Sequence, residues 1–365
     1  MEFIIKKPKN LISDILTYSV MSAPIKELVA YDLYGREFRT RAQLNVILVS
    51  SFGSGKGQLF REIEERGLGA RLTDYTSAGI LGTLRPSGKL TLPFTVYCAG
   101  KTICIDEFQK FGKPQKDALL SLMEDQYYRK PLGFEVKEEL DITEEYFRIM
   151  AKGNFYAIWI KCSYICGCMY FKRKTIDDLA LLSRGIPIVT TMQEDEALEL
   201  FTGRARLVLN DRLLKHYEKM KVDQVVIYHE QRELLKDLFK ELIKDVKMES
   251  GFITRALWDL VRIAGVIALT KGRTEIDEDD IYTAIKYAPI QILGYARGDL
   301  TFKEMEVYSI ISMHEEGISP KEIVELTGMS RSTVEKALAE LLRKGLVDVI
   351  YVSKNAIYMP KLKLV

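Results

Sequence analysis

An apolar segment that leads into a glycine-rich loop is the feature that most constrains the fold of this chain. Residues 46–49 read V-I-L-V, and residues 50–58 follow as S-S-F-G-S-G-K-G-Q. A continuous apolar run is typical of a strand that is buried on both faces of a parallel sheet. Glycines let the next turn approach a ligand, and backbone N–H groups at a helix start bind phosphate. The sequence therefore predicts an α/β fold with a phosphate cradle made by Gly53, Ser54, Gly55, Lys56, Gly57 and Gln58.

This loop departs from the usual phosphate-loop pattern, G-x-x-x-x-G-K-[ST]. Lys56 stands where a lysine reaches the β- and γ-phosphates. Ser50 replaces the first glycine, and Gly57 replaces the Ser or Thr whose hydroxyl binds Mg²⁺. A glycine–lysine loop alone also fits a plain turn, so the interpretation depends on a second motif.

The second motif is an apolar run that ends in two acids. Residues 102–105 read T-I-C-I, and Asp106 and Glu107 follow. Open α/β sheets bind ligands beyond the carboxyl ends of their strands. In a nucleotide hydrolase Asp106 would hold Mg²⁺, directly or through water, and Glu107 would polarise the attacking water. Two acids also suit an ordinary helix start, but the upstream loop favours a nucleotide site.

Composition limits the class of protein. The chain has 365 residues, of which 47% are apolar and 28% are charged, as expected of a soluble protein with more than one domain. The net charge of +2 gives no global basic field that would indicate nucleic acid. The sequence has no signal-peptide pattern and no uncharged apolar run of about 18 residues. We expect a cytoplasmic protein without a membrane partner.

Three of the five cysteines lie close together. Cys162, Cys166 and Cys168 are spaced C-x3-C-x-C inside an apolar run. A structural zinc site needs four ligands, and no fourth candidate is near in the sequence. We therefore expect buried free thiols on a central strand.

The pattern of apolar residues divides the chain into three parts. Residues 1–204 alternate strand-like and helical segments, as in a parallel sheet, with strands expected at 46–49, 102–105, 163–168 and 186–190. Residues 205–297 are expected to be helical, because apolar side chains from Leu235 to Val246 recur at the 3.6-residue period. Residues 298–365 form a third unit.

The third unit has the order of a winged helix-turn-helix. We expect a first helix over Glu304–Glu316, a second that begins with Ser319 and Pro320, and a third that Ser330 caps. An alternating hairpin follows over residues 346–359. The N-terminal residues of a recognition helix face the major groove, and here these are Arg331, Ser332, Thr333 and Lys336. Residues 329–365 hold seven Lys/Arg and three Asp/Glu, an excess that suits phosphate contacts. Protein docking is the alternative use of such a unit.

Together these segments resemble the AAA+ module of the minichromosome maintenance (MCM) family of replicative helicases. The likeness spans roughly residues 15–290, and nothing before it corresponds to the family's N-terminal DNA-binding domain. It rests on the Walker B segment 103–108, the T-S-A-G at 76–79, the L-M-E at 122–124, the A-K at 151–152, the L-S-R at 182–184 and the I-T-R at 253–255.

The resemblance implies roles for three basic residues. Lys152 resembles the lysine of the hairpin that touches DNA in the central channel. Arg184 resembles the arginine finger that reaches into a neighbouring subunit's site, and Arg255 resembles the sensor-2 arginine. Without the resemblance, each could be an ordinary solvated or helix-favouring residue.

The chain also departs from that family. Gly57 lacks the Mg²⁺-binding hydroxyl, and Met169 stands where the sensor-1 Asn is expected. A thioether is only a weak acceptor, and losing one such preorganised group typically slows a reaction by ~10²–10³. About twenty extra residues, 127–148, precede the hairpin lysine. We expect nucleotide binding with weak or lost hydrolysis.

Three functional hypotheses follow. The preferred one is an MCM-like AAA+ protein of DNA replication that binds ATP, Mg²⁺ and DNA, hydrolyses ATP poorly, and forms a homo-oligomer or joins an active MCM ring. The second is an active ATP-driven helicase or translocase. The third is a winged-helix DNA-binding or docking factor in which the AAA+ part is a scaffold.

Overall fold

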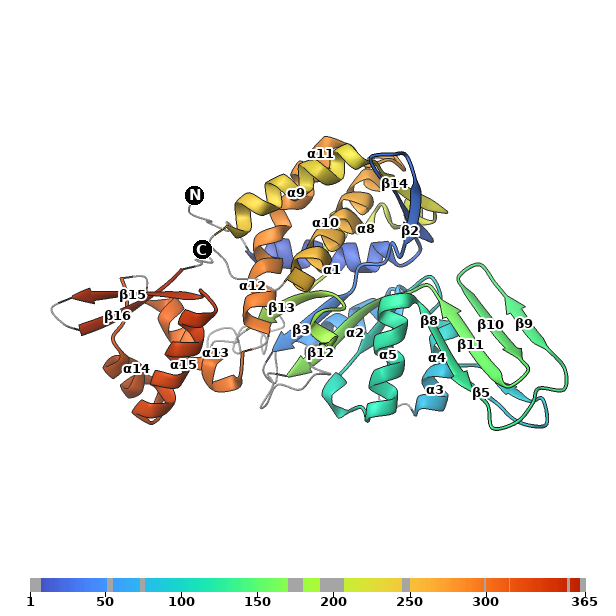
Figure 1. Cartoon of the computed structure of the whole chain (residues 1–365), viewed down its shortest axis with the longest axis horizontal. Helices are drawn as coiled ribbons and strands as arrows, with labels where there is room; N and C mark the ends of the chain where they lie inside the picture. Colours follow the sequence, from blue (N-terminus) through green and yellow to red (C-terminus); the bar gives the residue numbers. More distant parts are fainter. Residues whose placement is uncertain are drawn as a thin grey trace.

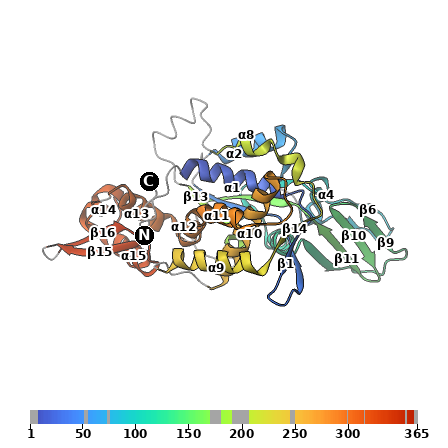
Figure 2. The ribbon, with the colours of Figure 1, turned by 90° about the horizontal axis from the view of Figure 1, so that it is seen from above.

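The computed structural model describes residues 8–50, 55–72, 76–169, 180–190, 207–244, 250–298, 300–314, 316–352 and 355–361. Figures 1 and 2 show an elongated molecule in two views at right angles. The C-terminal winged helix lies at one end, and an antiparallel sheet lies at the other. A parallel sheet and a group of helices lie between them.

The central sheet has five strands in the order β13-β3-β12-β7-β4, and every neighbouring pair is parallel. The strands are β3 (Val46–Ser50), β4 (Gly69–Leu72), β7 (Thr102–Ile105), β12 (Ser163–Met169) and β13 (Ile186–Thr190). Four of them lie where the sequence predicts strands. The prediction of an α/β fold with a parallel sheet is confirmed.

The sheet is buried on both faces, because its side chains alternate between two cores. Val46 and Leu48 of β3 point into one core, and Ile47 and Val49 point into the other. Helix α2 (Lys56–Glu65) covers the first face, and helix α5 (Lys113–Asp125) covers the second. Full burial of one such side chain contributes about 1.5–3 kcal/mol. This double burial explains why β3 reads as a continuous apolar run.

The predicted buried thiols are confirmed at the central strand of this sheet. Cys166 and Cys168 lie on β12, the third of the five strands, and Cys162 immediately precedes it; all three are buried and form no disulfide. Burial raises the pKa of the Cys166 thiol well above its usual range. These cysteines therefore pack as small apolar side chains.

A four-stranded antiparallel sheet extends from the second face in the order β8-β11-β10-β9. Its strands are β8 (Tyr127–Pro131), β9 (Leu140–Thr143), β10 (Phe147–Lys152) and β11 (Phe155–Ile160). The extra segment 127–148 therefore builds β8 and β9 around the β10–β11 hairpin. Beside it lie α3 (Ser77–Leu81), α4 (Phe94–Tyr97) and the short hairpin of β5 (Thr83–Leu84) and β6 (Leu90–Thr91).

Helix α1 (Pro8–Ser22) and the helices of the second part pack on the first face of the parallel sheet, which is the face opposite the antiparallel sheet. The helices of the second part include α8 (Asp211–Leu214), α9 (His229–Ile243), α10 (Ser250–Thr270), α11 (Glu278–Ala284) and α12 (Ala288–Gly298). A small sheet, β14-β1-β2, joins Gln224–Ile227 to Glu27–Tyr31 and Glu37–Thr40. The boundary predicted between residues 204 and 205 lies outside the described residues and stays a prediction.

The third unit is a winged helix. It consists of α13 (Phe302–Met313), α14 (Pro320–Thr327), α15 (Arg331–Arg343) and the hairpin of β15 (Val347–Val352) and β16 (Asn355–Pro360). Ser319 caps α14, and Gly328 ends it in the left-handed region at φ 65°. Ser330 caps α15 as predicted.

Both predicted ends of the first helix in this unit are wrong. Helix α13 begins at Phe302 rather than Glu304, because Thr301 and Glu304 form a reciprocal capping box. It ends at Met313, three residues before the predicted end. Glu304 is the third residue of the helix, not the first, and its carboxylate accepts a hydrogen bond from the Thr301 N–H at 2.7 Å.

Candidate functional site

Lys56 lies at the carboxyl end of the parallel sheet, where β3 leads into α2. Gly55 precedes it in the left-handed region at φ 85°, which favours glycine. The Lys56 ammonium donates a hydrogen bond to the Ser50 hydroxyl at the end of β3. Its aliphatic stem passes Gly167 of β12, where an added Cβ would lie 3.1 Å from the lysine Cδ. Gly53 and Ser54 lie outside the described residues.

The Lys56 ammonium lies among groups that can carry negative charge. Burial lowers its pKa, while Cys168, Asp106 and Glu107 act in the opposite direction and raise it. The loop lysine and the two acids after β7 therefore lie close enough to interact electrostatically. The sequence predicted both groups separately, and the sheet brings them to the same edge.

Asp106 already has a cationic partner. Its carboxylate forms an ion pair with the Arg71 guanidinium, which projects from the end of the neighbouring strand β4. Glu107 adopts a left-handed backbone at φ 53° and pairs with Lys110. A non-glycine residue in this region is uncommon and is found in functional sites as well as turns. The predicted roles of Asp106 and Glu107 stay predictions.

The first turn of α2 is open at the position of the missing hydroxyl. Gly57 and Gln58 are exposed, and a Cβ added at Gly57 would meet no atom within 4 Å. Met169 is the last residue of β12 and pairs in register with Ser50, so its backbone reaches the same edge of the sheet. The side chain of Met169 lies outside the described part of the chain.

Arg184 and Arg255 lie together in a second cluster with Glu124. One Glu124 oxygen is 3.1 Å from Arg184 Nε, and the other is 3.6 Å from Arg255 Nη2. Arg255 also donates to the Ser183 carbonyl at 2.6 Å. Burial lowers the pKa of Arg184, with Glu124 opposing that shift and Arg255 adding to it. Glu124 therefore separates two arginines that repel each other.

This second cluster lies at the opposite edge of the sheet from Lys56. Asn45 immediately precedes β3, and its side chain donates to the Met123 and Arg184 carbonyls at 3.1 and 3.0 Å. Lys56 follows the other end of that strand. Five residues of strand span about 16 Å. Within one chain, the two arginines and the loop lysine do not form one site.

Three residues of these clusters gave little signal in the sequence. Arg71 lies in β4, a short strand that the sequence analysis did not predict. Gly167 is an isolated glycine in a strand, which can mark a close approach, and here the Lys56 stem makes that approach. Glu124 was noted only as part of a matching segment, and its two arginine partners are 60 and more residues away.

The predicted DNA-contacting residues of the third unit lie at the start of α15. Arg331, Ser332 and Lys336 are exposed, and Thr333 is half-buried. Arg331 pairs with Glu335 one turn later at 2.9 Å. The wing is also exposed, with Tyr351 at 75%. The start of α15 therefore exposes basic side chains, and the wing exposes an aromatic one.

Lys152, the second predicted region of DNA contact, lies at the far end of the molecule. It ends β10 at the tip of the β10–β11 hairpin, and its ammonium is 2.9 Å from Glu139. The side chain is 59% exposed, so the pair is solvated and weak. The structure places this lysine on a projecting hairpin, as the resemblance implies, and its role stays a prediction.

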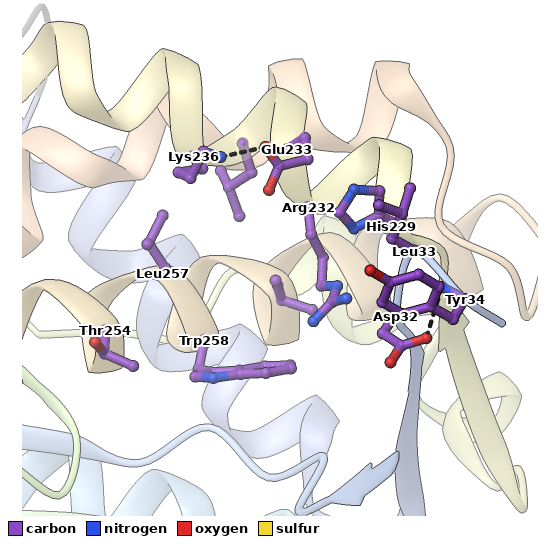
Figure 3. Close-up of a pocket in the computed structure, with 12 residues that line it drawn as sticks. Asp32, Leu33, Tyr34, His229, Arg232, Glu233, Lys236, Thr254, Leu257 and Trp258 are labelled. Carbon is purple, nitrogen blue, oxygen red and sulfur yellow. Dashed lines mark hydrogen bonds and ion pairs between the residues drawn. The ribbon is translucent and has the colours of Figure 1, made fainter. Parts of the chain in front are cut away.

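A cavity of about 380 Å³ lies between α9, α10 and the β1–β2 turn (Figure 3). Leu257 and Trp258 of α10 line one side, and Arg232 of α9 points toward Asp32 and Tyr34 of the turn. None of the predicted catalytic, nucleotide-binding or DNA-binding residues lines it. Lys236 and Glu233 at its rim pair with each other.

Among the described residues, no helix is both long and apolar enough to span a membrane. A comparison with curated proteins finds none that matches the chain. A family model described as MarR family matches residues 299–350, from the start of α13 into β15. The match agrees with the winged helix that the structure shows, and a winged helix of this type points to DNA binding.

Proposed function

We propose that this chain is an MCM-like AAA+ protein that binds ATP at the carboxyl end of its parallel sheet and DNA through its winged helix. The single observation that carries the nucleotide proposal is that Lys56 and Asp106 lie at the carboxyl end of the same parallel sheet, with the Lys56 stem passing Gly167 on the strand between them. They follow strands that are separated in the sheet by β12. A basic loop, a helix start and an acid at a strand end form the usual setting for a nucleotide phosphate.

Weak hydrolysis is part of this proposal. The attacking water needs preorganised groups around it, and Gly57 supplies no side chain. Loss of one such group typically costs ~10²–10³ in rate, whereas phosphate binding depends mainly on backbone N–H groups and Lys56. We therefore expect binding to survive a large loss of turnover.

An oligomer is the arrangement in which Arg184 and Arg255 would act. They lie at the sheet edge opposite Lys56, so a neighbouring copy or an MCM subunit would have to present its nucleotide site to them. Glu124 holds both guanidinium groups at that edge. Nucleotide-dependent assembly, measured by sedimentation, distinguishes this from a scaffold role.

Nucleotide binding is tested with a fluorescent ATP analogue and the full chain. Lys56→Ala should weaken binding at least about tenfold, since a hydrogen bond to a charged group contributes ~1.5–3 kcal/mol. Lys113→Ala, at an exposed position in the first turn of α5, is the matched control. Turnover of about one per second with single-stranded DNA present, an ordinary enzyme rate, would refute weak hydrolysis.

DNA binding is tested by titration at several salt concentrations. Arg331→Ala with Lys336→Ala should lower affinity and reduce the salt slope by about one for each lost phosphate contact. Lys321→Ala, at an exposed position of α14, should leave both unchanged. If removal of residues 300–365 changes neither affinity nor slope, the winged helix is a docking unit.

A further inference from the structure

The residues around Asp106 do not fit a resident Mg²⁺ ion. The carboxylate expected to hold the metal is engaged by the Arg71 guanidinium. The position that ordinarily supplies the second protein ligand is Gly57, which has no side chain. Mg²⁺ needs oxygen ligands in near-octahedral order, and this site offers a cation where the metal would lie.

Arg71 lies beside α2, the helix whose first turn lacks the hydroxyl. Its guanidinium carbon is 6.0 Å from the centre of the Phe60 ring. Phe60 is buried and lies three residues after the exposed Gly57 in α2. Arg71 therefore lies about one helical turn from Gly57 along α2.

The Arg71 guanidinium keeps donors to offer. One Nη group engages Asp106, whereas Nε is buried without a hydrogen-bond partner among the described residues. A guanidinium has five N–H donors in a rigid fork that matches phosphate oxygens. A buried donor without a partner is costly, and a phosphate oxygen at this edge would satisfy it.

We propose that Arg71 takes the place of Mg²⁺, so that this chain binds a nucleoside triphosphate without a divalent cation. Asp106 is then a positioning residue that orients Arg71, rather than a metal ligand. The proposal rests on the nucleotide site proposed above. Arg71 supplies the positive charge between the phosphates that the metal ordinarily supplies, and Gly57 leaves room for it.

The test measures binding of a fluorescent ATP analogue to the full chain in excess Mg²⁺ and in EDTA. The wild-type dissociation constant should change by less than about threefold between the two conditions. Arg71→Ala should lose about tenfold or more in EDTA, because a charge-assisted contact to phosphate is removed. Added Mg²⁺ should restore part of that loss, since Asp106 is then released for the metal.

Two further variants keep the test independent of folding. Arg61→Ala removes an exposed arginine from α2, and this variant should bind the nucleotide as wild type does in both conditions. Asp106→Asn should weaken binding equally with and without Mg²⁺. Thermal melts of each variant identify any that fail to fold.

Two results would overturn the inference in different ways. A wild-type affinity that falls about tenfold or more in EDTA, with Arg71→Ala unchanged, would restore Asp106 as a metal ligand and leave the nucleotide site standing. Absence of binding in every variant and condition would refute the nucleotide site itself, and the inference with it.

Discussion

Replacing Gly167 with alanine tests whether Lys56 is held in place by the strand beneath it. An added Cβ would lie 3.1 Å from the lysine Cδ, and 3.4 Å from both the lysine Cε and the Ile105 carbonyl. Optimal carbon–carbon contacts are about 3.5–4.0 Å. The strand is central in the sheet and cannot move, so the lysine stem must shift and carry its ammonium with it.

The magnitude follows from which atoms must move. The closest atom belongs to a flexible side chain, and alanine is favoured over glycine in a strand by roughly 0.5–1 kcal/mol. We therefore expect the free energy of unfolding to change by less than about 1 kcal/mol. The full contact of the ammonium with phosphate contributes ~1.5–3 kcal/mol, which corresponds to about tenfold to 150-fold in affinity. A displaced ammonium loses part of that contact, so nucleotide affinity should fall by no more than this amount.

The assay pairs nucleotide titration with thermal unfolding. Gly133→Ala is the matched control, because a Cβ there would meet no atom within 4 Å and the glycine has no positive φ. Unchanged affinity in Gly167→Ala would refute the reasoning if Lys56→Ala does weaken binding. Unchanged affinity in both variants would mean that Lys56 is not a phosphate ligand.

Three further predictions concern other parts of the molecule. Gly57→Ser should fold normally, since its Cβ position is open, and should gain a few tenths of a kcal/mol in thermal stability from helix propensity; a loss of several degrees in the melting temperature would contradict the open geometry. Glu124→Ala should cost about 1–2 kcal/mol in urea unfolding, because it leaves Arg184 and Arg255 facing each other, whereas Asp117→Ala on the exposed face of α5 should be neutral. Leu338→Ala in the winged-helix core should cost about 2–5 kcal/mol and reduce DNA affinity, while Leu326→Ala, 59% exposed, should stay within about 0.5 kcal/mol in the same melts.

Local patterns in the sequence were enough to predict the central strands and the winged helix. β3 and β7 are apolar except for Ser50 and Thr102 at their ends, because both of their faces are buried, and this leaves a continuous signal. The helices α14 and α15 begin where Ser319 and Ser330 cap them. In each case the residues that specify the element lie within one turn or one strand of it, so no distant contact was needed.

The candidate sites were only partly predictable, because their partners come from distant segments. Lys56 and Asp106 could be named from their motifs, yet the pairing of Asp106 with Arg71 depends on β4 lying beside β7. The cluster at Glu124 likewise joins α5, the turn before β13 and α10. No period or spacing in the sequence encodes these neighbours.

The buried strands, the glycine–lysine loop and the caps of the winged helix can be read from the residues alone, since each follows from short-range sterics and burial. The charges around each motif depend on how the chain folds. The parallel order of the sheet brings Arg71 to Asp106 at one edge, and it sends Arg184 and Arg255 to the other edge. The reason is physical: strand order fixes which carboxyl ends are adjacent, and electrostatic interactions act between neighbours in space.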